Sequence, residues 1–329
     1  MSCPSSPVET VTPETLARAA ELIRAGGIVA FPTETVYGLG ANALDEEAVR
    51  RVFEAKGRPS TSPLIVHVES VEMARGLVRD WPPSAEALAR QYWPGPLTLV
   101  LEKQPHVPGI VTAGLPTVGL RMPAHPLALS LIRAAGVPIA APSANRFAKL
   151  SPTTARHVRD ALGGRVDLIL DGGPTEVGIE STVLSLAASP PRLLRPGRVT
   201  QTDIEAVIGS IEIAGRIENG DNDGHPSPGL HPKHYSPATP LVLVDGGPLP
   251  AGRGVYLYRE RHAQAARCVA MPTDAGAYAA VLYETLHRED AAGWDWIAVE
   301  RPPEGPEWAG VTDRLTRAES KRSGSGDKS

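Results

Sequence analysis

The chain has 329 residues, of which 42% are hydrophobic, and its formal net charge at pH 7 is −4. This length allows one large domain or two domains of ordinary size, each with its own core. A protein that holds nucleic acid mainly through counterion release is usually basic, so the charge argues against strong nucleic-acid binding.

Short apolar runs alternate with amphipathic segments in the first two thirds of the chain. The apolar runs predict buried strands near residues 26–31, 63–68, 97–101, 117–123, 138–142, 167–172 and 181–186. The amphipathic segments predict helices at 45–56, 125–136 and 153–164, the first of them capped by Asp45. Several strands that need helical cover favour an α/β architecture.

This pattern stops near residue 212, and a second one begins near residue 240. Between them, residues 215–240 are rich in Gly, Pro, Asp, Asn and His and carry no apolar periodicity, which is typical of a linker. Four short apolar runs and an amphipathic helix at 274–290 then predict a small α/β domain. We therefore expect a flexible N-terminus at 1–12, a catalytic domain at 13–213, a linker at 214–239, a C-terminal domain at 240–318 and a disordered tail at 319–329.

Cysteine usage and the N-terminal sequence favour a cytoplasmic protein. The two cysteines, Cys3 and Cys268, form no C-x-x-C pattern, which predicts free thiols in a reducing compartment and no structural metal. The first residues lack the basic and apolar regions of a signal peptide. No apolar run approaches the roughly 20 residues that cross a bilayer, so we expect no membrane partner.

The stretch GLGANA at 38–43 has the G-x-G-x-x-A spacing of a dinucleotide-binding turn. A strand precedes it, a helix follows it, and the next strand ends in Glu69. In such a turn, however, the first glycine comes directly after the strand, whereas six residues separate Phe31 from Gly38. The intervening TETVY favours a polar loop over another ligand. A nicotinamide oxidoreductase stays an alternative, which NADH binding without ATP binding would support.

Lys56 and Arg58 form the strongest candidate for a phosphate site. They lie in the last helical turn and in the loop before the next strand, where a favourable interaction with the helix dipole also explains basic residues. With Gly57 between them and hydroxyls at 60–62, the pair is typical of a phosphate clamp. The chain has no Walker A loop, so another element must hold a polyphosphate.

Polar residues also follow or interrupt other predicted strands. Ser143 and Asn145 come directly after a strand, where they either contact a ligand or cap the next turn. Ser151 precedes Pro152, either as a helix N-cap or as a phosphate contact.

Two charged or titratable side chains interrupt apolar strands. Arg121 needs a buried anion, which is either a structural Glu or a substrate carboxylate. His67 is either a satisfied core residue or a ligand contact. Ser181 and Arg195 lie at strand ends beside glycine-rich turns and are weaker candidates.

Seven motifs in one order give the chain a family resemblance. FPTETVYGLGANA, AKGRPSTSPLIVHV, WPGPLTLVL, TVGLRMPAHP, APSAN with SPT, IESTV and LLRPG resemble the YrdC-like L-threonylcarbamoyladenylate synthases. SPGLHPKHYSP and the second α/β region resemble the two-domain form with a C-terminal SUA-type domain. The resemblance implies a twisted, mixed open sheet with helices, joined by a linker to a small Rossmann-like α/β domain.

The resemblance also implies a reaction. Such enzymes condense L-threonine, bicarbonate and ATP into threonylcarbamoyl-AMP and release pyrophosphate. A tRNA threonylcarbamoyl transferase complex then takes the product, so little direct nucleic-acid binding is expected. Mg²⁺ would accompany ATP rather than occupy a protein site. Lys56 and Arg58 are our candidate catalytic residues, because charge builds on the phosphate oxygens during the transfer.

Binding roles follow from the motifs. The positions that match ATP contacts are Arg58, Ser62, Thr117, Ser143, Ser151, Arg195 and Tyr235, with Asn145 in the same polar signature. The positions that match threonine contacts are Thr35, His67, Arg121, Ala141 and Ser181. Two departures stand out: Ser62 replaces a frequent Asn, and Phe147-Ala148 replaces a frequent Ser-Gly. The linker that carries Tyr235 is expected to fold over the site.

Two further alternatives compete with the synthase interpretation. One is an RNA-binding YrdC-like module without adenylate synthesis, which the net charge disfavours. The other is a carbamoyltransferase, whose additional zinc-finger regions the two cysteines exclude.

Overall fold

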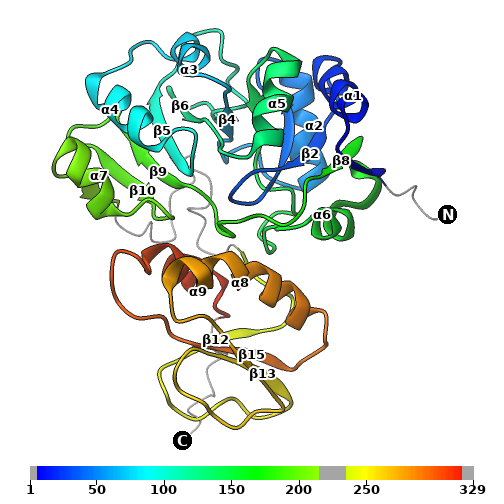
Figure 1. Cartoon of the computed structure of the whole chain (residues 1–329), viewed down its shortest axis with the longest axis vertical. Coiled ribbons are helices and arrows are strands. Elements are labelled where there is room, and N and C mark those ends of the chain that lie inside the picture. The colour runs from blue at the N-terminus through cyan, green and yellow to red at the C-terminus, as the bar shows by residue number, and fades with distance from the viewer. Residues whose placement is uncertain (1–5, 215–234, 321–329) are drawn as a thin grey trace, which may run out of the picture.

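The computed structural model describes residues 6–214 and 235–320. They form a larger body, built on a mixed sheet in the order β1-β8-β2-β3-β7-β4-β6-β5-β9-β10-β11, and a smaller one with four strands (Figure 1). The strands of the larger body are β1 (Val8–Thr10), β2 (Val29–Pro32), β3 (Tyr37–Asn42), β4 (Ile65–His67), β5 (Leu97–Glu102), β6 (Thr117–Arg121), β7 (Ile139–Ala140), β8 (Leu168–Asp171), β9 (Thr182–Ser185), β10 (Arg192–Arg195) and β11 (Glu212–Ile213).

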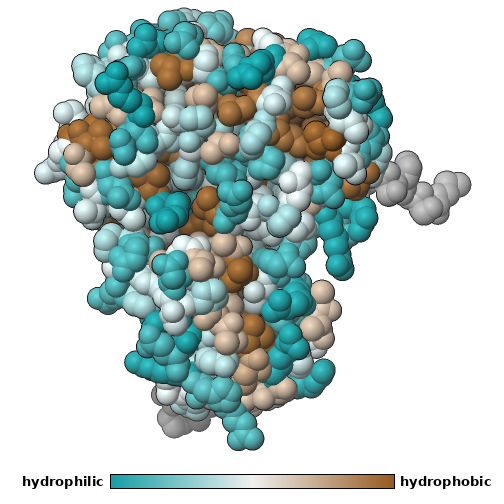
Figure 2. Space-filling model, in the orientation of Figure 1, coloured by the Kyte–Doolittle hydropathy of each residue, from teal (hydrophilic) through white to brown (hydrophobic). Residues whose placement is uncertain are grey.

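The helices of the larger body shield this sheet from solvent. They are α1 (Pro13–Arg24), α2 (Glu46–Lys56), α3 (Val71–Leu77), α4 (Pro83–Tyr92), α5 (Pro126–Ala135), α6 (Ala155–Leu162) and α7 (Gln201–Ile208). Helix α2 begins where predicted, because the Asp45 carboxylate accepts from the amides of Glu47 and Ala48, and it ends at Gly57 in the left-handed conformation. The face of the molecule seen in Figure 2 is mainly hydrophilic, with hydrophobic residues in small groups.

The smaller body confirms the predicted α/β character of the C-terminal region. Its strands β12 (Leu241–Val244), β13 (Gly254–Tyr258), β14 (Arg267–Ala270) and β15 (Trp296–Glu300) are parallel, in the order β12-β15-β13-β14. Helices α8 (Ala275–Asp290) and α9 (Ala309–Ala318) pack on one face of this sheet and lie between it and the larger body (Figure 1). The other face is covered by loops that contribute Leu249 and Ala263.

The GLGANA stretch does not form a dinucleotide turn. Gly38 and Gly40 lie inside β3, which pairs antiparallel with β2 in register Phe31↔Gly38. A Cβ at Gly40 would lie 2.6 Å from the Phe31 ring and 2.8 Å from Ile139, so glycine is needed for close packing. The polar loop reduces to the turn at 33–36. The motif therefore carries no argument for a nicotinamide enzyme.

Three other expectations need correction. The N-terminus is ordered from Ser6, because Ser6 bonds the backbone of Val166 and β1 pairs with β8. Ser151 is not an N-cap, since α6 begins at Ala155 and Thr154 caps it. The predicted disordered tail at 319–329 is wrong for Glu319 and Ser320, which bond the backbone of β12, and the rest of it lies outside the described residues. The predicted linker lies mostly at 215–234, outside the described residues.

Among the helices of residues 6–214 and 235–320, none combines the length and apolar character needed to span a bilayer.

Candidate active site

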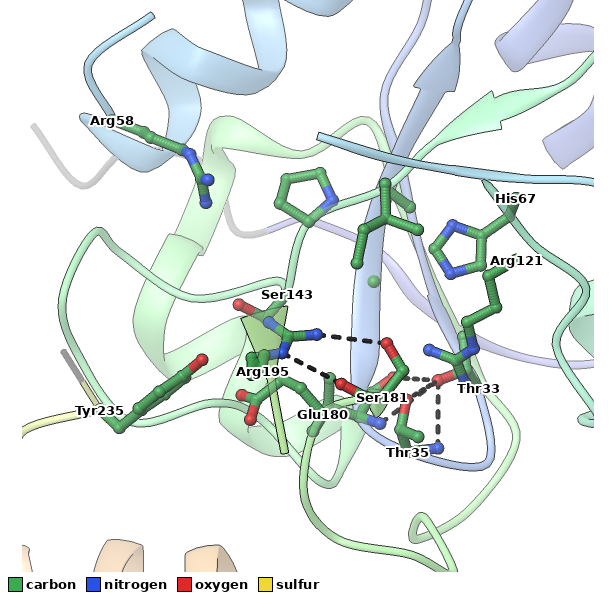
Figure 3. A pocket seen from close by; sticks show the side chains of 15 residues that line it. Thr33, Thr35, Arg58, His67, Arg121, Ser143, Glu180, Ser181, Arg195 and Tyr235 are labelled. Carbon is green, nitrogen blue, oxygen red and sulfur yellow. Dashed lines mark hydrogen bonds between the residues drawn. The ribbon is translucent and has the colours of Figure 1, made fainter. Parts of the chain in front are cut away.

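One buried cavity collects most of the side chains that the sequence singled out (Figure 3). They come from neighbouring strands: the β2–β3 turn, the ends of β4, β6 and β10, the segment after β7 and the segment before β9. His67 and Arg121 lie directly opposite each other, because β4 and β6 are parallel and these residues are register partners. The site thus forms where strand ends meet at one edge of the sheet, as in other open α/β sheets.

The cavity has two ends (Figure 3). His67 and Arg121 lie on one side, Arg58 and Tyr235 on the other, and Ser181 and Arg195 between them. All five residues predicted to contact threonine line it: Thr35, His67, Arg121, Ala141 and Ser181. Of those predicted to contact ATP, the cavity brings together Arg58, Ser143, Arg195 and Tyr235.

The other predicted ATP contacts lie behind the cavity wall. The Ser151 hydroxyl donates to the Glu180 carboxylate, and the Asn145 side-chain amide donates to the backbone oxygens of Arg146 and Lys149. Ser62 is buried in the loop after α2. Thr117 lines a smaller neighbouring hollow that shares Ile65 with the main cavity.

Lys56 does not face the cavity in this structure. Its side chain is 2% exposed, and Nζ donates to the backbone oxygens of Ser143 and Asn145. Burial and the neighbouring Arg58 lower the pKa of Lys56. The ammonium therefore holds the segment after β7, and through it Ser143, in place.

Arg58 does face the cavity. Its Nη2 donates to the backbone oxygen of Pro63 at 3.1 Å, and among the described residues its buried Nε has no hydrogen-bond partner. Burial, with a smaller contribution from Arg195, lowers the pKa of Arg58 to about 10, so the guanidinium stays charged at neutral pH. Arg58 and Arg195 together make this end of the cavity suitable for an anion.

Arg121 is paired with a carboxylate whose residue number the sequence analysis did not predict. Its Nη2 lies 2.7 Å from Glu34 Oε1, and both side chains are buried. Nε donates to the backbone oxygen of Gly95 at 3.2 Å. Of the two predicted partners, the structural Glu is therefore present, supplied by the β2–β3 turn.

Neutral donors and acceptors surround this pair. Burial first, and the positive charge of Arg121 second, lower the pKa of His67 to about 3, so its imidazole is neutral near pH 7. Thr33, which the sequence did not single out, bonds Thr35 Oγ1 at 2.8 Å and accepts from the amides of Thr35 and Val36. The hydroxyl of Thr35 is thereby fixed in the cavity wall.

Glu180 is the second carboxylate that the sequence did not single out. It lines the cavity beside Ser181 and pairs with Arg314 of the C-terminal domain at 2.8 Å. The motif IESTV contained it, but its partner lies 134 residues further along the chain.

Tyr235 brings the end of the linker to the site. It is 1% exposed, and the next residue, Ser236, donates to the backbone oxygen of Ala148 at 3.0 Å. Ala148 replaces the glycine expected from the resemblance and has φ of 64°, the region that glycine favours. The linker therefore returns to the larger body beside the predicted ATP contacts.

The fold agrees with comparisons to known proteins. A family profile described as "Telomere recombination" matches residues 21–197, and a second, described as "Threonylcarbamoyl-AMP synthase, C-terminal domain", matches residues 199–320. A protein named threonylcarbamoyl-AMP synthase from Bacillus subtilis is 44% identical over 323 residues, 92% of each chain. One of the same name from Pyrococcus abyssi is 53% identical over 228 residues, 69% of this chain and 67% of that one.

Solved structures extend the match to three dimensions. The crystal structure of P. abyssi Sua5 complexed with L-threonine superposes with a TM-score of 0.88 at 41% identity, covering 96% of this chain and 97% of that one. The H234A/Y235A variant of P. abyssi Sua5 gives a TM-score of 0.87. This chain therefore belongs to the Sua5/YciO/YrdC family, in the two-domain form that carries the Sua5 C-terminal domain.

Proposed function

We propose that this chain condenses L-threonine, bicarbonate and ATP into L-threonylcarbamoyladenylate and releases pyrophosphate. One observation supports this most. A single cavity carries polar side chains that can bind an amino acid at one end and two guanidinium groups toward the other. The P. abyssi relative, 41% identical, was solved with L-threonine bound. Two relatives that are 44% and 53% identical to this chain are named threonylcarbamoyl-AMP synthases.

Threonine fits the end formed by His67 and Arg121. The Arg121 guanidinium, already oriented by Glu34, would share its remaining donors with the threonine carboxylate. The neutral His67 and the hydroxyls of Thr35 and Ser181 suit the amine and the hydroxyl of the amino acid. A neutral imidazole also avoids repelling the protonated amine.

The phosphates fit the part of the cavity between Arg195, near its middle, and Arg58, at the end away from His67 and Arg121. The threonine amine first loses its proton. It then condenses with bicarbonate and releases water, or adds to carbon dioxide and releases a second proton, to give a carbamate. A carbamate oxygen attacks the α-phosphorus in line, and pyrophosphate leaves. Positioning and electrostatic stabilisation dominate such transfers. Arg58 is the candidate for stabilising the developing charge, while Lys56 holds the Ser143 segment that frames the nucleotide.

Mg²⁺ would come with the triphosphate. In the described part of the chain no group of three or more His, Cys, Asp or Glu side chains could hold a metal ion. The cavity carboxylate, Glu180, is paired with Arg314. The residues present therefore fit a metal held by ATP rather than by a protein cage.

The product is labile, which gives the linker a role. A carbamate exposed to water decomposes, so a segment that covers the site protects it. The position of Tyr235 at the cavity supports this role. We expect the adenylate to pass to a tRNA threonylcarbamoyl transferase complex, without strong direct RNA binding by this chain.

Pyrophosphate release from ATP tests the proposal, with threonine and bicarbonate omitted in turn from the full-length protein. We expect release that requires both compounds. Release that needs neither, or a salt-dependent shift of tRNA without any release, would contradict the proposal; the second result would favour the RNA-binding alternative.

A further inference from the structure

Two segments of the larger body carry cavity residues and touch the C-terminal domain. The first precedes β9 and carries Ser181. The second begins directly after Arg195, the last residue of β10. Helices α8 and α9 face these segments (Figure 1). The C-terminal domain thus lies directly behind the middle of the cavity.

Glycines allow the backbones to approach closely at both segments. A Cβ at Gly178, whose φ is 77°, would lie 2.2 Å from the backbone oxygen of Ala279 in α8. A Cβ at Gly310 in α9 would lie 3.1 Å from the Cα of Gly197. Each helix is therefore seated against a segment that leads into the site.

One buried side chain of α9 bonds both segments. Arg314 is 1% exposed; its Nε donates to Glu180 Oε2 at 2.8 Å and its Nη2 to the Glu180 backbone oxygen at 3.0 Å. Its Nη1 donates to the backbone oxygen of Pro196 at 2.6 Å. A single guanidinium thereby fixes the distance between the segment of Ser181 and the segment of Arg195.

The bonds continue from these segments to the cavity. Arg195 Nε donates to the Ser181 backbone oxygen at 3.0 Å and Nη2 to Ser181 Oγ at 3.2 Å. The Tyr283 hydroxyl of α8 donates to Glu180 at 3.2 Å, and Arg314 lies 5.4 Å from the Tyr235 ring. Arg314 therefore directly contacts two side chains that line the site, Glu180 and Tyr235. It also bonds the chain neighbours of two others, Ser181 and Arg195.

We propose that Arg314 is a positioning residue of the active site, through which the C-terminal domain sets the arrangement of Glu180, Ser181 and Arg195. The positive charge of Arg314 also compensates the negative charge of the Glu180 carboxylate. Without Arg314, that carboxylate would face the cavity uncompensated, draw the Arg195 guanidinium toward itself and repel the phosphates of ATP. The inference rests on the proposed function, because it assigns ATP to this end of the cavity.

ATP binding by the full-length chain tests this role. Arg314→Gln should raise the Kd for Mg·ATP by about 10- to 100-fold, the range expected when a binding group is displaced. The double variant Arg314→Gln/Glu180→Gln should recover only part of that loss. It removes the uncompensated carboxylate, but the bonds of Arg314 to the backbone oxygens of Glu180 and Pro196 stay absent. Arg301→Gln is the matched control, since Arg301 forms an exposed ion pair with Asp245 in the same domain.

Wild-type ATP affinity in Arg314→Gln would overturn the proposal. Wild-type affinity in the double variant would overturn it too, because the charge of Glu180 would then account for the whole loss. If Arg314→Gln fails to fold, Arg314→Lys decides, because it keeps the charge but cannot bond all three acceptors: a raised Kd supports positioning, and an unchanged Kd contradicts it. Binding is measured separately from turnover. A wild-type chain that binds ATP without threonine-dependent pyrophosphate release would refute the proposed function and still test Arg314.

Discussion

Arg58→Ala is expected to lower kcat for pyrophosphate release by about 100- to 1000-fold, the cost of removing one preorganised charge partner of a transition state. Arg58 is charged at neutral pH and lines the cavity at the end proposed to hold the phosphates. The fold should survive, because among the described residues the guanidinium donates a single hydrogen bond, to the Pro63 backbone oxygen, worth about 1 kcal/mol.

Single-turnover kinetics and the thermal midpoint of unfolding, measured on the same preparation, check this prediction. Arg50→Ala is the control, since Arg50 lies on α2, the helix just before Arg58, in an exposed ion pair with Glu47. Near-normal turnover in folded Arg58→Ala would remove Arg58 from the reaction.

Arg121→Met is expected to lower the free energy of unfolding by about 3–5 kcal/mol, because it leaves the Glu34 carboxylate buried without its partner. Arg121→Met/Glu34→Gln should restore most of that stability, since neither charge remains. Threonine binding should stay lost in the double variant, because the threonine carboxylate would have no guanidinium. Urea unfolding and threonine titration measure the two effects.

This pair of variants separates the two partners of Arg121 that the sequence left open. If the folded double variant binds threonine as tightly as the wild type, Arg121 serves Glu34 alone. The ligand would then be held by His67 and the neighbouring hydroxyls.

The sequence predicted the elements whose signals are local. The amphipathic pattern and the Asp45 cap located α2, and the same reasoning located α5, α6 and α8. It did not assign β3, because a Gly-rich run has low strand propensity. Only the packing of Gly40 against the Phe31 ring explains why that run is extended.

The sequence predicted which residues line the site better than it predicted which of them bond to each other. The residues that the resemblance implies for threonine binding do line one cavity, and their role there stays a prediction. The resemblance could not tell that Lys56 bonds the backbone of Ser143 instead of facing the cavity. A phosphate contact and a backbone contact both require only a buried basic side chain near a loop. The Glu180–Arg314 pair joins two domains, and no local pattern connects residues so far apart.

The fate of carbon from bicarbonate tests the central claim most directly. The full-length protein would be supplied with ¹³C-bicarbonate, L-threonine and ATP, and the adenylate would be analysed by mass spectrometry. The account predicts an adenylate that contains threonine and retains the label, because the carbamate oxygen attacks the α-phosphorus. An adenylate of threonine without the label would contradict it, since the amino-acid carboxylate would then be the attacking group.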